Sequence, residues 1–219
     1  MIPASRFFDS IAGRYERAYA LPAEESRRRM KRVLRELPPA PATVLDLGVG
    51  TGRELAALQD AGYVPTGVDV SRAMLERCAR RGRPVPLVEA DFWQPLPFPD
   101  SAFDAAVALH GSLAHPPQDA ALRSLAEELA RIVKTGGVWI VEAPSPGWLD
   151  GLPTLPMPAG QRITRTGTST CVIEDAVVSS AIEARVFSEP EWREALAPWW
   201  KARVEPDSAF EWVVVARRS

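Results

Sequence analysis

Glycines and an acidic side chain cluster at the end of one short apolar run. The segment Asp46-Leu47-Gly48-Val49-Gly50-Thr51-Gly52 overlaps the end of the run 43–47. Glycines in such a turn let a ligand approach the backbone closely. A helix that begins there would add unpaired N–H groups and a partial positive charge. The segment therefore predicts a ligand-binding loop between a strand and a helix.

Two more carboxylates follow the next two apolar runs. Asp69 ends the run Gly67-Val68-Asp69-Val70, where a carboxylate can accept both hydroxyls of a ribose. Asp91 precedes Phe92 and Trp93, so it could accept an adenine amino group beside aromatic surface for the ring. Together with the glycine segment, these residues predict a nucleoside ligand.

The glycine spacing and Asp46 distinguish between two such ligands. The spacing is G-x-G-x-G and not the G-x-G-x-x-G that suits a pyrophosphate. A carboxylate at the strand tip attracts a cationic or amino-bearing group and repels a pyrophosphate. The pattern favours S-adenosylmethionine over NAD, and it disfavours the alternative of an NAD-dependent oxidoreductase.

Two histidines are the candidate catalytic residues. His110 and His115 are the only histidines of the chain, and they follow the apolar run 103–109. We expect one or both to line the site of the molecule that reacts with this ligand, either as a base or only as hydrogen-bonding groups. The catalytic residue is not identified by the sequence. No metal is expected, since Cys78 and Cys171 lack metal-ligand spacing and are read as free thiols.

Apolar runs and helical patterns alternate through the first two thirds of the chain. Strands are expected at 43–47, 64–69, 85–89, 103–109 and 138–141, with helices between them, one of them capped by Ser71 and another ended by Gly136 and Gly137. This alternation predicts a parallel sheet with helices on both faces. Before it, a helix capped by Ser5 with an apolar face reaching Tyr19, and a helix over 23–37, are expected.

The C-terminal third departs from that alternation. Five prolines between 144 and 160 predict an irregular loop. Residues 161–187 read as a strand pair turning at Gly167, with a helix over 173–184 as the alternative. A capping box, Ser188 to Glu191, begins a helix that two closing strands follow, at about 200–205 and 210–216.

Composition excludes some classes of protein. The chain has 219 residues, 46% apolar and 25% charged, and no apolar run of 18 residues that would span a membrane. The N-terminus lacks a signal-peptide core, so we expect a cytoplasmic location. A net charge of −2 argues against a nucleic-acid binder. The basic run 27–32 is interpreted as a solvated helix face, with Met30, Val33, Leu34 and Leu37 as its buried stripe.

On these residues, the chain resembles the class I S-adenosylmethionine-dependent methyltransferases, and most of all the small bacterial enzymes that act on small molecules. The resemblance covers residues 5–143 well and the rest loosely. It implies an α/β, Rossmann-like, doubly wound sheet of seven strands in the order 3-2-1-4-5-7-6, mostly parallel with an antiparallel last strand. It also implies one domain over 1–219, made of a helical cap (1–40), a cofactor-binding core (41–143), an acceptor-side insert (144–187) and a closing segment (188–219).

The resemblance also implies roles for single residues in binding S-adenosylmethionine. Its methionine part would meet Asp46, Gly48, Gly50 and Gly52, its ribose Asp69, its adenine Val70, Met74, Asp91 and Phe92, and its sulfonium the strand end at Leu109 and His110, with Tyr15 folded over it.

The expected reaction is methyl transfer to a small, partly apolar molecule, with S-adenosylhomocysteine as the other product. His115 and Trp148, with Leu149, Leu152, Leu155 and Met157 in the insert, are the candidates for lining the acceptor site. Two alternatives stay open: a non-catalytic S-adenosylmethionine-binding partner or regulator, and a nucleic-acid methyltransferase. The sequence leaves open the acceptor atom and the oligomeric state.

Overall fold

The computed structural model describes residues 1–118, 120–153, 158–208 and 210–219. The strands are β1 (Thr43–Leu47), β2 (Val64–Asp69), β3 (Leu87–Glu89), β4 (Phe103–Ala108), β5 (Val133–Pro144), β6 (Gln161–Arg165), β7 (Thr170–Asp175), β8 (Ser180–Arg185), β9 (Trp200–Pro206) and β10 (Glu211–Arg218). The helices are α1 (Ala4–Ile11), α2 (Tyr15–Ala18), α3 (Ala23–Glu36), α4 (Leu55–Asp60), α5 (Arg72–Ala79), α6 (Ala121–Ile132), α7 (Pro146–Gly151) and α8 (Glu189–Leu196), with a 3-10 turn η1 (Ser112–Ala114).

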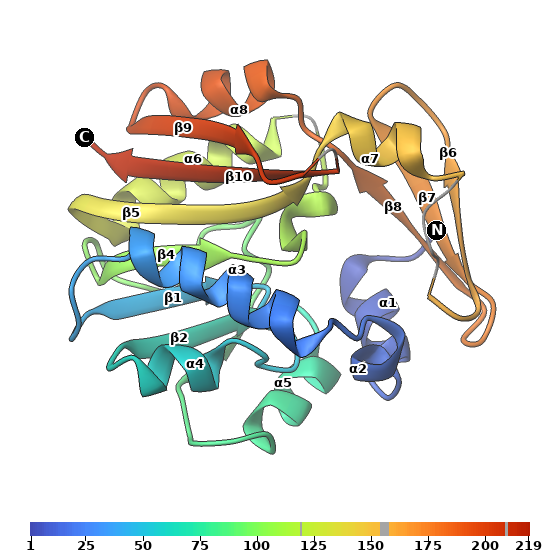
Figure 1. The fold of residues 1–219 in the computed structure, drawn as a ribbon, viewed down its shortest axis with the longest axis horizontal. Coiled ribbons are helices and arrows are strands. Elements are labelled where there is room, and N and C mark those ends of the chain that lie inside the picture. The colour runs from blue at the N-terminus through green and yellow to red at the C-terminus, as the bar shows by residue number, and fades with distance from the viewer. Residues whose placement is uncertain (119, 154–157, 209) are drawn as a thin grey trace.

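Seven strands form the main sheet, in the order β3-β2-β1-β4-β5-β10-β9. The neighbouring strands from β3 through β2, β1 and β4 to β5 pair in parallel. Strand β10 pairs antiparallel with both β5 and β9. Figure 1 shows α3 crossing one face of this sheet, with α6 behind it. The predicted strand order, the antiparallel last strand and the α/β class are confirmed.

The insert forms a second sheet with one strand more than the predicted strand pair. Residues 161–185 form three antiparallel strands, β6-β7-β8, so the helical alternative over 173–184 is wrong. The turn near Gly167 is present, but a second turn follows β7. There the Asp175 side chain accepts hydrogen bonds from the Val177 and Val178 amides, and Ser179 takes a positive φ of 53°. This turn lacks glycine and proline, the usual signals of a turn.

Three local predictions need correction. The expected first helix is two: α1 starts after Pro3, not at a Ser5 cap, and the backbone breaks at 12–14 before α2. The loop expected over 144–160 contains α7. Gly136 and Gly137 lie inside β5 and do not end α6. A Cβ on Gly137 would lie 2.7 Å from the Asp104 carbonyl oxygen, so close approach of β4 explains this glycine.

Two arginines of α3, Arg29 and Arg32, lie in ion pairs and are not solvated as the sequence predicted, whereas Arg27, Arg28 and Lys31 of the basic run are exposed. Arg29 is buried and pairs with Glu142 of β5 and Glu211 of β10. Arg32 pairs with the same Glu142 and with Asp207. A helix with apolar residues on one side still places these arginines beside the acidic strand ends. The ion pairs fasten α3 to β5 and the C-terminal hairpin, while Met30, Val33 and Leu37 pack on the sheet as expected.

The face of the sheet opposite α3 holds a tryptophan-rich core. Trp192 of α8 is fully buried, and its ring centroid lies 6.4 Å from that of Trp139 and 5.5 Å from that of Phe187. Cys78 and Cys171 are buried free thiols, as predicted. Within the described ranges, no helix is both long and apolar enough to cross a membrane.

We expect Trp192→Ala to lower the free energy of unfolding by about 3–5 kcal/mol, because it leaves a large cavity in this core. Urea denaturation monitored by circular dichroism measures the loss. Trp192→Phe is the matched control. It should cost less than about 1.5 kcal/mol, since it keeps most of the ring and removes an N–H that has no hydrogen-bond partner in the described part of the chain. Equal losses in both variants would contradict this account of the core.

Candidate functional site

One cavity of about 990 Å³ lies at the carboxyl ends of the parallel strands. The strand ends, the N-terminal segment with α1 and α2, and strands β7 and β8 enclose it. In Figure 1, α1, α2, β7 and β8 lie to the right, at the end towards which β1 and β4 run. The predicted site residues on its wall are Tyr15, Asp46, Gly48, Gly50, Asp69, Val70, Met74, Asp91, Phe92, Leu109, His110, His115 and Trp148.

Of the predicted cofactor-binding residues, Gly52 does not line the cavity. It has a φ of +76°, and a Cβ there would lie 2.6 Å from the Cys78 Sγ, so its role is packing against α5. The turn before it is held by the Gly48 and Val49 amides, which both donate to the Val68 carbonyl oxygen at 2.8 and 3.0 Å. Gly48 has a φ of +73°, and a Cβ there would lie 2.6 Å from the Cβ of Ser112.

Asp69 joins the end of β2 to the glycine turn. Its Oδ2 accepts from the Gly50 amide and its Oδ1 from the Ser71 amide, each at 2.8 Å. Burial raises the pKa of Asp69, although these two hydrogen bonds act in the opposite direction. Each oxygen has a further lone pair, so the carboxylate can still accept two hydroxyl groups.

The environment of Asp46 disfavours a charged carboxylate more strongly than that of Asp69. It is 3% exposed, and its carboxylate accepts no hydrogen bond from the other described residues. Burial, with the nearby carboxylates of Glu54 and Asp69, raises its pKa to about 8, while His110 acts against the shift. A buried carboxylate without a partner is stabilised by a cation. The cavity wall at Asp46 therefore suits a positively charged ligand group.

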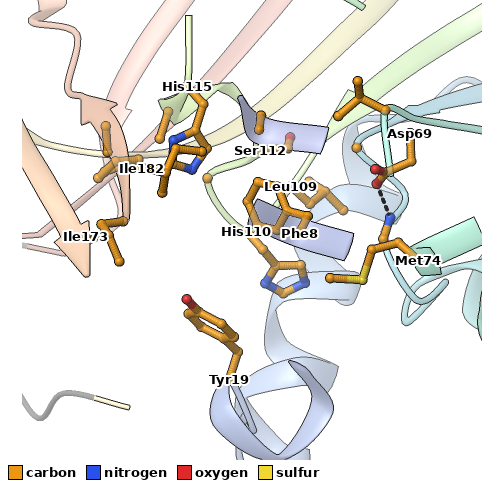
Figure 2. Close-up of a pocket in the computed structure, with 18 of the residues that line it drawn as sticks. Phe8, Tyr19, Asp69, Met74, Leu109, His110, Ser112, His115, Ile173 and Ile182 are labelled. Carbon is orange, nitrogen blue, oxygen red and sulfur yellow. Dashed lines mark hydrogen bonds between the residues drawn. The ribbon is translucent and has the colours of Figure 1, made fainter. Parts of the chain in front are cut away.

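Glu54 is a site residue that the sequence analysis missed. It lines the cavity, is buried, and its Oε1 lies 2.5 Å from the Nε2 of His110. Burial disfavours the charged imidazole, but the hydrogen bond and charge of Glu54 outweigh burial and raise the pKa of His110. His110 has a φ of +54°, a strained conformation for a histidine. Its ring lies beside Met74 on the cavity wall (Figure 2).

Arg53, which follows the last glycine of the segment, was also missed. Its Nη1 donates to the Tyr19 carbonyl oxygen at 2.8 Å, its Nε contacts Glu16, and its guanidinium lies 5.2 Å from the centroid of the Tyr15 ring. Its Nη2 is buried and has no hydrogen-bond partner among the residues that the structure describes. Arg53 thus ties α2 to the glycine turn and leaves one donor for a ligand.

These groups fit the amino-acid end of S-adenosylmethionine. An ammonium would satisfy the unpartnered carboxylate of Asp46, and a carboxylate would satisfy the orphan Nη2 of Arg53. The free lone pairs of Asp69 match ribose hydroxyls. Asp91 uses its Oδ1 to accept from the Trp93 amide at 3.0 Å, which leaves its other oxygen for an adenine amino group beside Phe92. The donor set therefore fits the expected cofactor.

The other half of the cavity is largely apolar. His115 projects from the segment after η1 towards Ile182 of β8, with Ile173 of β7 opposite and Tyr19 below (Figure 2). Phe8 of α1 meets the His115 ring edge-on, with centroids 5.4 Å apart. Trp148 of α7 also lines the cavity. Leu149 packs in the core of the insert and Leu152 packs against it, whereas Leu155 and Met157 lie outside the described residues.

No group of three histidine, cysteine, aspartate or glutamate side chains suited to a metal occurs in the described part of the chain.

The chain is similar to known methyltransferases in sequence and in fold. Residues 44–137 match the model of a methyltransferase domain. A demethylmenaquinone methyltransferase of Thermus thermophilus is 35% identical over 148 residues, which are 64% of this chain and 65% of that protein. The chain spans only 49%, 25% and 52% of the lengths of three other curated relatives.

Solved structures share the fold over most of the chain. The CcbJ methyltransferase from Streptomyces caelestis is 18% identical and matches all of both chains with a TM-score of 0.75. The sugar N-methyltransferase KedS8 from a Streptoalloteichus species is 25% identical, with a TM-score of 0.68 over 88% of this chain and 86% of that one.

We expect Gly48→Ala to destabilise the protein more than Gly136→Ala, a matched control. Both glycines have positive φ, which costs an alanine roughly 1–2 kcal/mol, but a Cβ on Gly136 would have open space within 4 Å. Only Gly48→Ala adds a clash, with Ser112. In a double-mutant cycle, Ser112→Gly should recover the excess loss, as thermal unfolding would show. An equal cost at both glycines would refute the close approach of Ser112.

Proposed function

We propose that this chain, a member of the class I S-adenosylmethionine-dependent methyltransferases, transfers a methyl group to a small, partly apolar molecule. The observation that carries the proposal is the buried, unpartnered carboxylate of Asp46, set beside the orphan donor of Arg53 and the half-satisfied carboxylate of Asp69. The expected cytoplasmic location and single-domain organisation belong to the same proposal.

The residues that would hold the cofactor come from the ends of the first three strands and the loops after them. In this proposal, Asp46 binds the amino group, Arg53 the carboxylate, Asp69 the ribose hydroxyls and Asp91 the adenine amino group, with Phe92 and Trp93 against the adenine ring. When bound, S-adenosylmethionine supplies a methyl group on a positively charged sulfur, which an acceptor takes by in-line displacement.

The chain's own contribution is to position the reactants and exclude water. The cap residues Phe8, Tyr15 and Tyr19 cover the cavity from one side and the β7–β8 strands from another. Such enclosure strengthens electrostatic interactions inside and holds an acceptor near the reacting carbon. Most of the catalytic effect would therefore come from geometry, and no covalent intermediate with the protein is needed.

A small acceptor is favoured over a nucleic acid. The wall of the acceptor half is apolar, and the cap closes over it. The main support for nucleic-acid binding was the basic run on α3, where Arg28, Arg29 and Arg32 are engaged with acidic side chains. The alternative of a non-catalytic binding protein is separated from an enzyme by measuring S-adenosylhomocysteine release with a panel of small acceptors.

Asp69→Ala should weaken S-adenosylhomocysteine binding by about 1–3 kcal/mol, since two ribose hydroxyls lose their acceptor. Isothermal titration calorimetry measures the affinity, with thermal unfolding to verify the fold. Asp60→Ala, which removes an exposed carboxylate of α4, is the control and should bind normally. NAD should not bind either protein. Binding of NAD without S-adenosylhomocysteine would overturn the assignment.

Arg53→Met should discriminate between two related ligands. S-adenosylhomocysteine has an amino-acid end and 5′-methylthioadenosine lacks it, so only the former loses the charged hydrogen bond, worth about 1.5–3 kcal/mol. Calorimetry should show weaker binding of S-adenosylhomocysteine and nearly unchanged binding of methylthioadenosine. Because Arg53 also holds α2, an equal loss for both ligands would mean that it acts only on the cap.

A further inference from the structure

His115 is held in one tautomer by the insert. Its Nδ1 lies 2.7 Å from the carbonyl oxygen of Glu183 in β8. A carbonyl oxygen carries no proton, so Nδ1 must donate. In the neutral ring, Nε2 is then a bare lone pair, and the ring belongs to the cavity wall. The hydrogen bond thus fixes which nitrogen can accept a proton.

The surroundings of His115 keep its ring neutral. Burial among Phe8, Ile182 and neighbouring apolar groups lowers its pKa, and the hydrogen bond to Glu183 only partly opposes this. The charged groups on the elements packed around His115 either have other partners or are exposed to solvent. Asp9 of α1 accepts hydrogen bonds from Ser71 and Ala73, Arg6 is exposed, the Glu183 side chain is exposed, Arg185 pairs with Glu191, and His110 pairs with Glu54.

His110 and His115 therefore have different electrostatic roles. Glu54 favours the imidazolium of His110, whereas His115 has only a carbonyl oxygen as partner. A proton acceptor must begin neutral, so His115 alone of the two qualifies.

We propose, resting on the methyltransferase function above, that the methyl acceptor is an amine and that His115 Nε2 takes its proton. The N–H bond of the bound ammonium breaks, its electron pair stays on nitrogen, and the proton forms a bond to Nε2. The nitrogen lone pair would then form the bond to the methyl carbon as the carbon–sulfur bond breaks, with its electron pair left on the sulfur of S-adenosylhomocysteine, and the imidazolium later returns its proton to water.

The cavity wall favours this class of acceptor over anions. The described arginines on the wall are Arg29, Arg53 and Arg185, and each is already ion-paired with a carboxylate. The donor left on Arg53 belongs to the cofactor half. A carboxylate or phosphate acceptor would therefore have no cation of its own in the apolar half.

Proton affinities favour an amine over an alcohol. An alkylammonium has a pKa of roughly 10 in water, and an apolar cavity lowers it towards that of imidazole. An alcohol, like water, holds its proton far more tightly than an ammonium does, so a neutral imidazole of reduced basicity cannot remove it. Imidazole is thus matched to the ammonium proton.

The test uses matched acceptor pairs: cyclohexylamine with cyclohexanol, benzylamine with benzyl alcohol, and 2-amino-2-deoxyglucose with glucose. S-adenosylhomocysteine release and mass spectrometry report methylation by the full chain. We expect N-methylation of at least one amine and none of the alcohols. His115→Asn, whose side-chain amide can still donate to the Glu183 carbonyl, should lower kcat about 100-fold at pH 7 with KM within about threefold.

The pH profile separates proton transfer from a structural role. The wild-type rate should level off above the pKa of His115, whereas the rate of His115→Asn should rise about tenfold per pH unit up to the amine pKa, because solvent then supplies the free amine. In His115→Gln the longer side chain places its amide differently relative to the Glu183 carbonyl. If this variant folds, it should show the same pH profile as His115→Asn.

Several outcomes would overturn the inference: methylation of an alcohol, no methylation of any amine in the panel, or a pH profile of His115→Asn that runs parallel to that of the wild type. Each is distinguishable from failure of the proposed function, because S-adenosylhomocysteine binding is measured separately by calorimetry. Its affinity should be the same in wild type and His115→Asn.

Discussion

The gathering of acidic side chains where β1 and β2 end is the constraint on which the rest of the site depends. Parallel strands bring Asp46 and Asp69 to the same sheet edge, and the turn after β1 adds Glu54. Three buried carboxylates repel one another unless each is compensated. Asp69 has two backbone amides and Glu54 has His110, while Asp46 has neither. At neutral pH Asp46, whose pKa is raised to about 8, is largely protonated in the free protein, and a cationic ligand would favour its charged form.

Much of this was predictable from the sequence, because strand-end motifs are local. The alternation of apolar runs gave the strand order once joined to a family resemblance, and the glycine segment with Asp69 and Asp91 predicted the cofactor half of the cavity. Arg53 and Glu54 were not predicted, since a charged residue after a glycine turn reads as helix surface. Only the tertiary placement of Tyr19 and His110 gives these two residues partners.

The insert was harder to predict for a different reason. Its strands turn at Asp175 through side-chain hydrogen bonds to the backbone, without the glycine or proline that marks most turns. The basic run of α3 was misread likewise, because periodicity shows which side of a helix is apolar but not which acids lie beside its polar side. Glu142 and Asp207 come from strands far along the chain, so their pairing with Arg29 and Arg32 is invisible in a local pattern.

The cap and the insert contact each other, and their junction forms one of the two halves of the cavity. Arg14, just before α2, pairs with the buried Asp175 of β7, and the Tyr19 hydroxyl donates to Gln161 of β6 at 2.9 Å. The Ile2 amide donates to the Ala181 carbonyl oxygen of β8 at 3.0 Å. In the proposed division of the cavity, the sheet ends build the cofactor half, and the junction of cap and insert builds the acceptor half. Changes in the insert act directly on the acceptor wall around His115, and they can reach the glycine turn through Tyr19, which contacts both Gln161 and Arg53.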